Sequence, residues 1–177
     1  MDMPTFFAEI SGRDPFAAGI DMADELEILK VLQRHRVQFV VIGGYAVNFH
    51  GFTRATEDMD VVWVRSKEAE GALLEALAEI DARYIGEEID PATRIERTYP
   101  VTLQYIQSWG VMMLLTKFGF VDLFDHIPGF PQEDVRQLMT SSLDVAGIRY
   151  ASLHWLREMK RAAARPKDQL DLENLPE

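Results

Sequence analysis

The 177-residue chain contains no cysteine, so disulfide bonds and thiolate metal sites are excluded. No apolar run approaches the roughly 18 residues that a membrane-spanning helix requires. The first residues also lack the positively charged start and apolar core of a signal peptide, and we expect a cytoplasmic protein. Basic residues are scarce, because 18 Lys and Arg stand against 29 Asp and Glu, for a formal net charge of −11. This balance argues against extensive DNA binding and leaves only a local basic patch for polyanions.

Several catalytic motifs are also missing. Neither G-x-x-x-x-G-K-[ST] nor G-x-G-x-x-G occurs, which argues against a P-loop and against a Rossmann-type dinucleotide site. The four histidines do not have the spacing of zinc ligands, and no G-x-S-x-G nucleophile elbow is present. These absences direct attention to the acidic residues.

Two glycines and two aspartates stand in a close, ordered arrangement. A Val/Ile-rich strand is predicted over residues 39–42, and Gly43 and Gly44 follow it, just before a short helical stretch. Glycine lets the backbone approach a ligand closely, so N–H groups at this point can bind a phosphate. Asp58 and Asp60 open a second apolar strand, where residues i and i+2 point to the same face. Such a carboxylate pair suits a divalent metal ion.

Each half of this arrangement also has an ordinary interpretation. Two acids separated by one residue are common as solvated turn residues in an acidic protein, and a Gly-Gly pair is often only a tight turn. In this order and on these elements, however, the two halves together indicate metal-dependent nucleotide chemistry.

A third acid lies in a later apolar strand, Phe120–Phe124. Asp122 stands there among Phe, Val and Leu, where an unpaired carboxylate is costly to bury. Asp125 is the competing candidate, and because it lies three residues further on, it is expected to point to the opposite face. The residues alone leave both acids open, and the choice of Asp122 follows from the family resemblance given below.

The rest of the chain alternates helical and extended patterns. Residues 1–20 show no clean period and are predicted to form an irregular arm, while residues 21–177 are predicted to form one domain. The Asp90-Pro91 pair is predicted to begin a helix, Trp109 is predicted to be a core residue, and the remainder of residues 82–110 is not assigned. The predicted helices cover residues 22–32, 45–50, 66–80, 132–139, 152–164 and 168–175, and the predicted extended segments cover 37–42, 61–64, 111–116, 120–127 and 145–150. This mixture predicts an α/β (α+β) fold, with a mixed β-sheet flanked by helices and a short C-terminal helical segment from about residue 152.

The order of strand, Gly-Gly, roughly a dozen residues, Asp-x-Asp and a later carboxylate resembles the nucleotidyltransferase-fold superfamily, which includes polymerase-beta-like enzymes. The longer string from Gly43 to Asp60, and the tail from Lys160 through Asp168 to Leu172, resemble its bacterial branch of small nucleotidyltransferases. That branch contains toxin–antitoxin and abortive-infection enzymes. The resemblance covers about residues 25–175.

The resemblance implies transfer of a nucleoside monophosphate from a nucleoside triphosphate, with ATP as the expected donor, to a hydroxyl group. The acceptor would be a tRNA, a protein or a small molecule, and a cognate antitoxin would be a possible partner. Asp58, Asp60 and Asp122 would be both the catalytic and the metal-binding residues, with two Mg²⁺ ions as cofactors. Asp122 would in addition accept the proton of the attacking hydroxyl.

Four further residues are assigned to nucleotide binding. Gly43 and Gly44 would present backbone N–H groups to the β- and γ-phosphates, Arg54 would neutralise a phosphate oxygen, and Lys160 would reach the triphosphate or orient a carboxylate. The two basic roles follow from the resemblance, and a solvated helix face is an equal alternative for Lys160. The candidate local basic patch consists of Arg157, Lys160, Arg161, Arg165 and Lys167, although Arg165, Lys167 and Asp168 can equally be charges around a helix break.

A different class of function stays open. The chain can be a catalytically silent nucleotidyltransferase-like module that binds nucleotide or a partner protein. The intact set of three aspartates argues against this alternative. The glycine at position 44 keeps it open, because many members of the superfamily carry serine there, with a hydroxyl that can bind phosphate.

Overall fold

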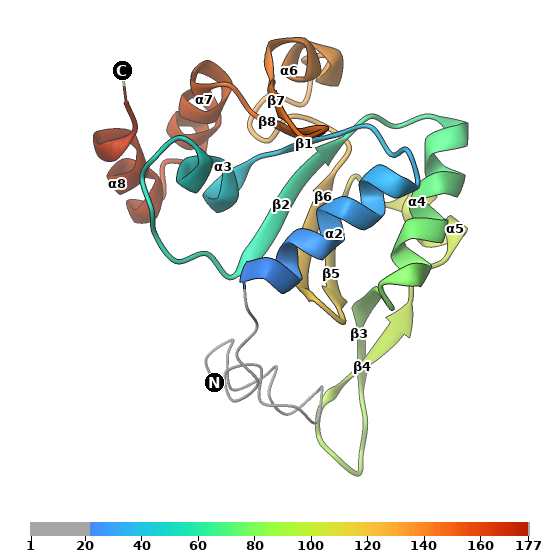
Figure 1. Cartoon of the computed structure of the whole chain (residues 1–177). Coiled ribbons are helices and arrows are strands. Elements are labelled where there is room, and N and C mark those ends of the chain that lie inside the picture. Colours follow the sequence, from blue (N-terminus) through green and yellow to red (C-terminus); the bar gives the residue numbers. More distant parts are fainter. Residues whose placement is uncertain (1–21, 177) are drawn as a thin grey trace.

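The computed structural model describes residues 22–176, and the side chains of residues 25–176 (Figure 1). The predicted arm, residues 1–20, therefore lies outside the described residues. The helices are α2 (Met22–Arg34), α3 (Gly43–Phe49), α4 (Lys67–Glu79), α5 (Leu103–Ser108), α6 (Val135–Ser141), α7 (Leu153–Ala163) and α8 (Pro166–Asn174). The strands are β1 (Phe39–Val41), β2 (Asp58–Trp63), β3 (Arg83–Ile89), β4 (Glu96–Pro100), β5 (Val111–Thr116), β6 (Gly119–Phe124), β7 (Leu143–Val145) and β8 (Ile148–Tyr150).

All eight of these strands belong to one sheet, in the order β4-β3-β5-β6-β2-β1-β8-β7. The sheet is mixed, because β2 runs parallel to β6 and β1 runs parallel to β8, whereas the other neighbours are antiparallel. Parallel neighbours require a crossover connection, and between β2 and β6 this crossover contains α4, α5 and three further strands. Strands from distant parts of the sequence therefore meet at the centre of the sheet.

One face of the sheet is covered by α2, α4 and α5 (Figure 1). Alternate residues of the central strands point to this face, as the two-residue period of a strand requires. Met59, Val61 and Trp63 of β2 are fully buried there against apolar side chains of α2 and α4. Burial of this apolar surface is the main stabilising contribution to the fold.

The opposite face carries a second, smaller core over β1 and β2. Val40 and Val62 pack there with Leu138 of α6 and Met159 of α7. A third cluster joins α3 to α7, where Ala46 and Val47 meet Leu156. Helix α7 is thereby held beside the end of β1, close to the Gly-Gly turn.

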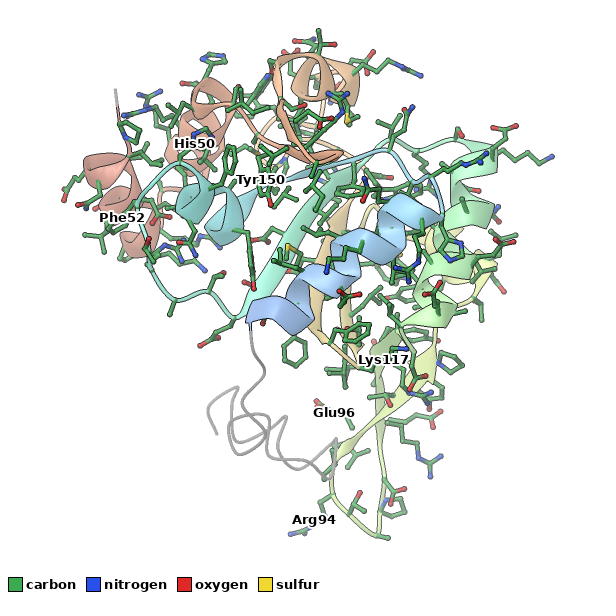
Figure 2. All side chains as sticks on the ribbon, in the orientation of Figure 1. His50, Phe52, Arg94, Glu96, Lys117 and Tyr150 are labelled. Carbon is green, nitrogen blue, oxygen red and sulfur yellow. The ribbon has the colours of Figure 1, made fainter. Side chains whose placement is uncertain are left out.

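The region between residues 82 and 110 differs from the sequence-based prediction. Asp90-Pro91 does not begin a helix but lies in the turn between β3 and β4, whose hairpin carries Arg94 and Glu96 near its tip (Figure 2). A helix start was predicted because a proline follows a possible N-capping residue, but an Asp-Pro pair also initiates turns. Trp109 is 55% exposed, so its prediction as a core residue is wrong.

Two extended segments were also predicted with the wrong bounds. Strand β6 ends at Phe124, before Asp125. The extended piece near residues 145–150 is a hairpin of β7 and β8, and Ala146 and Gly147 in its turn have positive φ.

None of the helices in residues 22–176 is long and apolar enough to cross a membrane.

Candidate active site

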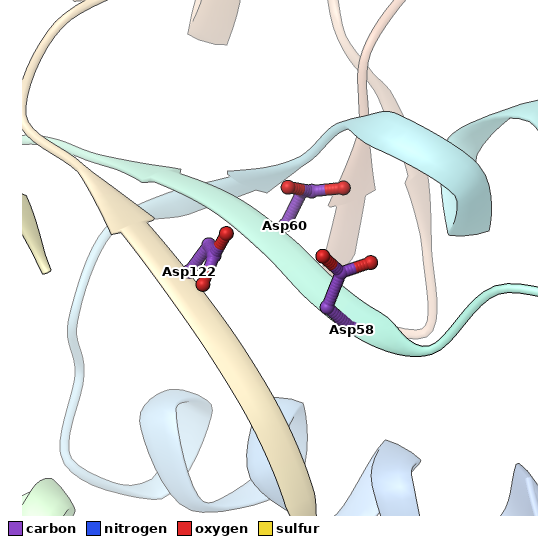
Figure 3. Close-up of side chains that lie close together, drawn as sticks. All are labelled: Asp58, Asp60 and Asp122. Carbon is purple, nitrogen blue, oxygen red and sulfur yellow. The ribbon is translucent and has the colours of Figure 1, made fainter. Parts of the chain in front are cut away.

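Three carboxylates meet on one face of the sheet, at the junction of β2 and β6 (Figure 3). The parallel register places Asp60 directly beside Asp122, and Asp58 lies two residues earlier on the same face of β2. Oxygen atoms of all three side chains lie within 4.8 Å of one another. Carboxylate oxygens at this separation are the ligands that Mg²⁺ prefers, so the donor set fits a divalent metal ion.

Asp125 lies elsewhere and has its own partners. It accepts a hydrogen bond of 2.7 Å from Nη1 of Arg65, and its other oxygen is 3.0 Å from Nδ1 of His126. Arg65 also binds Glu70 at 2.9 Å, which links Asp125 to helix α4. Among the described residues, Asp125 is therefore part of a separate ion-pair group and not of the carboxylate cluster.

The Gly-Gly turn packs directly against this cluster. Gly43 has φ +58°, and a Cβ atom added to it would lie 1.8 Å from Oδ2 of Asp60. A Cβ atom on Gly44 would lie 2.4 Å from Oγ1 of Thr56. Glycine is thus required at position 43 both by the left-handed backbone and by the close approach of the aspartate. The turn brings the backbone at the start of α3 beside the carboxylates.

Burial and, secondly, the mutual repulsion of the acids raise their pKa values. Burial, followed by the charge of Asp58, raises the pKa of Asp60 to about 6. Burial, followed by the charges of Asp60 and Asp58, raises the pKa of Asp122 to about 7. Glu25 of α2 has a pKa of about 7 for the same reasons, burial first and Asp58 second. A bound cation would remove this mutual repulsion, and this is the second reason why the cluster fits a metal ion.

A buried ion network stands beside the cluster and joins α7, α8 and the segment before β2. Nζ of Lys160 lies 3.0 Å from Asp168 and 2.8 Å from Asp171, and the three side chains are at most 5% exposed. Arg54 donates from Nε and Nη2 to the two oxygens of Asp171 at 2.6 and 2.8 Å. The interpretation of Lys160 as a solvated helix-face residue is therefore wrong.

The turn between α7 and α8 adds two more cations. Arg165 donates from Nε to Asp168 at 2.7 Å, and its side chain is 57% exposed. Pro166 opens α8, where its missing N–H is not needed, and Lys167 follows with an exposed side chain. Lys167 lines the same cavity as Asp60 and Asp122, and its positive charge acts to lower the pKa of both carboxyl groups.

These groups enclose a cavity of about 310 Å³. All of the residues predicted for the site from the sequence line it, namely Gly43, Gly44, Arg54, Asp58, Asp60, Asp122 and Lys160. Sequence reasoning did not assign Thr56, Lys167 or the buried carboxylates Asp168 and Asp171 to the site. For the three charged residues the available signals were the dense run of charges from Lys160 to Asp171, which was also compatible with a helix break, and the resemblance of this tail to the bacterial branch.

No protein-family model matches the chain, and no curated protein matches its sequence. Solved structures do match its fold. The solution structure of the antibiotic-resistance factor ANT(2'')-Ia has a TM-score of 0.54 at 14% identity, covering 85% of this chain and 80% of that one. ANT(2'')-Ia in complex with adenylyl-2''-tobramycin has a TM-score of 0.50 at 15% identity, with 88% and 86% covered. The lincosamide antibiotic adenylyltransferase LnuA, lincomycin-bound, has a TM-score of 0.52 at 15% identity, with 88% and 96% covered. The predicted fold is thus confirmed, and this chain has the nucleotidyltransferase fold.

Proposed function

We propose that the protein is a metal-dependent nucleotidyltransferase that moves a nucleoside monophosphate from a nucleoside triphosphate to a hydroxyl acceptor. The observation that carries this proposal is the cluster of Asp58, Asp60 and Asp122 in a cavity that also contains a glycine turn and four basic side chains. The fold shared with two antibiotic-modifying proteins supports the same chemistry.

The charge balance of the cavity supports the metal dependence. Its basic residues are Arg54, Lys160, Arg165 and Lys167, and its acidic residues are Asp58, Asp60, Asp122 and Asp168. The equally charged Asp171 stands behind them, bound to Arg54 and Lys160, so negative charge is in slight excess. A polyanionic triphosphate gains little from such a site unless divalent cations enter with it. We propose two Mg²⁺ ions, held by the three aspartates.

The side chains have distinct roles in the proposed reaction. Asp58 and Asp60 would hold the metal ions, which when bound stabilise negative charge on the reacting phosphate. Asp122, on the neighbouring strand β6, would help to hold the metal ions and would accept the proton of the acceptor hydroxyl. Gly43 and Gly44 would present backbone N–H groups to the triphosphate, because without side chains their backbone can lie directly against Asp60 and Thr56.

We propose ATP as the donor and a small hydroxyl-bearing molecule as the acceptor. The solved structures of similar fold contain small molecules, namely adenylyl-2''-tobramycin and lincomycin. The net charge of −11 disfavours the polyanionic tRNA relative to a neutral or cationic compound. A tRNA or protein acceptor, and a role beside a cognate antitoxin, are the alternatives that an acceptor screen would distinguish.

The proposal is tested by label transfer. The protein would be incubated with Mg²⁺ and each α-³²P-labelled nucleoside triphosphate, together with a bacterial lysate as the pool of acceptors. The same assay would be run on an Asp58→Asn/Asp60→Asn variant and on a control variant, Asp81→Asn, which changes an exposed aspartate outside the site.

We expect label in a small-molecule fraction with the wild type and the Asp81 variant only. Label in RNA or in protein would keep the transferase and replace the acceptor. Nucleotide binding without any transfer would favour the silent module, and the absence of nucleotide binding would refute the nucleotide function.

A further inference from the structure

The cations of the cavity differ in how far their charge is already used by the protein. Arg54 and Lys160, the two that sequence reasoning assigned to the triphosphate, share the buried carboxylate of Asp171. Lys160 is in addition bound to Asp168 and has only 5% of its side chain exposed. A cation in a satisfied buried network loses existing hydrogen bonds if it turns toward a ligand. These two residues are therefore poor candidates for a strong new phosphate contact.

Arg165 occupies an intermediate position. Its Nε is bound to Asp168 at 2.7 Å and its Nη2 to the same carboxylate at 3.3 Å, although the side chain is 57% exposed. Its guanidinium is thus held on the protein by a two-point contact, with only its remaining donors available.

Lys167 is the exception. Its side chain is exposed and lines the cavity, and within residues 22–176 it has neither an ion pair nor a hydrogen bond. The turn that carries it is well fixed. Pro166 restricts the backbone just before it, and the neighbouring Asp168 is fully buried, with its carboxylate accepting from the backbone N–H of Arg165 at 3.2 Å. The backbone on both sides of Lys167 is therefore fixed, while its ammonium group has no partner among the described residues.

We propose that Lys167 is the residue that binds the β- and γ-phosphates of the donor nucleotide, and that Arg54 and Lys160 are positioning residues that hold α8 against the site. This inference rests on the proposed function, because it names the cation that recognises the triphosphate at that same site. The buried carboxylates Asp168 and Asp171 have a defined purpose in this arrangement. They neutralise the inner cations and fix the helix from which Lys167 projects.

The test compares nucleotides that do and do not carry the outer phosphates. Binding of α,β-methylene-ATP and of AMP, each with Mg²⁺, would be measured by isothermal titration calorimetry on the wild type, Lys167→Ala and Lys167→Arg. The matched control is Lys67→Ala, which removes another exposed lysine from the first turn of a helix, α4. Thermal unfolding of each variant would show whether the fold is intact.

We expect Lys167→Ala to weaken binding of the ATP analogue about tenfold, which corresponds to one charge-assisted hydrogen bond. AMP binding and the unfolding midpoint stay unchanged, Lys167→Arg recovers most of the affinity, and Lys67→Ala has no effect.

Two results would overturn the assignment. The first is an affinity of Lys167→Ala for the ATP analogue within about twofold of the wild type. The second is an equal loss for AMP accompanied by a lower unfolding midpoint, which would indicate a structural role. A wild type that binds neither nucleotide would refute the proposed function itself, and the two failures are thus distinguishable.

Discussion

The buried carboxylate of Asp171 offers the sharpest test of the structural reasoning, through the change Asp171→Asn. Asp171 is fully buried and receives three contacts, from Nε and Nη2 of Arg54 at 2.6 and 2.8 Å and from Nζ of Lys160 at 2.8 Å. Burial alone would raise the pKa of this carboxyl, but the hydrogen bonds from Arg54 and Lys160 outweigh it and lower the pKa. The network depends on the ionised form.

The expected magnitude follows from the charges left behind. In the native network Arg54, Lys160 and Arg165 pair with two carboxylates, and Asp171→Asn leaves Arg54 without its carboxylate and Lys160 with Asp168 alone. Removing one partner of a buried ion pair costs about 3–5 kcal/mol, because the remaining charge stays desolvated. The change Lys160→Met is expected to cost less, about 3 kcal/mol, since each carboxylate then keeps one arginine. The order of the two losses is thus itself a prediction.

The assay is equilibrium unfolding in urea, with the free energy of unfolding extrapolated to water. The control is Glu173→Gln, which alters an exposed acid on the same helix, α8, and is expected to change stability by less than about 0.5 kcal/mol. If Asp171→Asn destabilised the protein by less than about 1 kcal/mol, or less than Lys160→Met did, the assignment of a satisfied buried network would be wrong.

Three further predictions concern the carboxylates and the glycine turn. Gly43→Ala is expected to lower the transfer rate about a hundredfold, because the new Cβ would displace Asp60; Gly71→Ala, at a helical position with open space, serves as the control. The pKa values of Asp60 and Asp122, about 6 and about 7 against an ordinary 3.8, predict that in the metal-free protein the contribution of these two groups to stability is full below about pH 4 and is lost as the pH rises from 4 to about 7. Saturating Mg²⁺ should abolish that loss, and the affinity of the protein for Mg²⁺, measured by calorimetry, should rise over the same pH range. A contribution to stability that does not change with pH would contradict the burial and mutual repulsion of these acids. Asp122→Asn is expected to reduce the rate of nucleotidyl transfer by at least about a hundredfold, whereas Asp125→Asn should mainly lower the stability of the protein. If the two changes slowed transfer equally in the label-transfer assay, the third carboxylate would be misassigned.

The centre of the fold was predictable because its signals are local. The apolar run before Gly43 and the alternation that follows Asp58 each specify a strand from a few neighbouring residues, and Ser66 caps α4 as its position before an apolar helical pattern predicts. Asp122 was preferred to Asp125 because the resemblance places the third carboxylate on this strand and side-chain parity puts Asp125 on the opposite face, and in the structure the two do lie in different groups of side chains.

Residues 82–110 were not predictable in the same way. The hairpin of β3 and β4 has no buried residue in either strand, and therefore lacks the apolar alternation that identifies a half-buried strand. Asp90-Pro91 then gave a helix-start signal that a turn can satisfy equally well. Trp109 shows the same limit, since residue type alone does not decide burial.

The sequence by itself determined the order of the central elements and placed Asp58 and Asp60 on one face of their strand, because these depend on backbone geometry over a few residues. Only the tertiary structure decided which charges are available. Arg54 and Asp171 are 117 residues apart and meet through the packing of α8. That meeting pairs two expected ligand-binding cations with buried carboxylates, whereas the side chain of Lys167 has no ion pair within residues 22–176. A carboxylate buried in a protein must be neutralised by whichever partner the fold brings near.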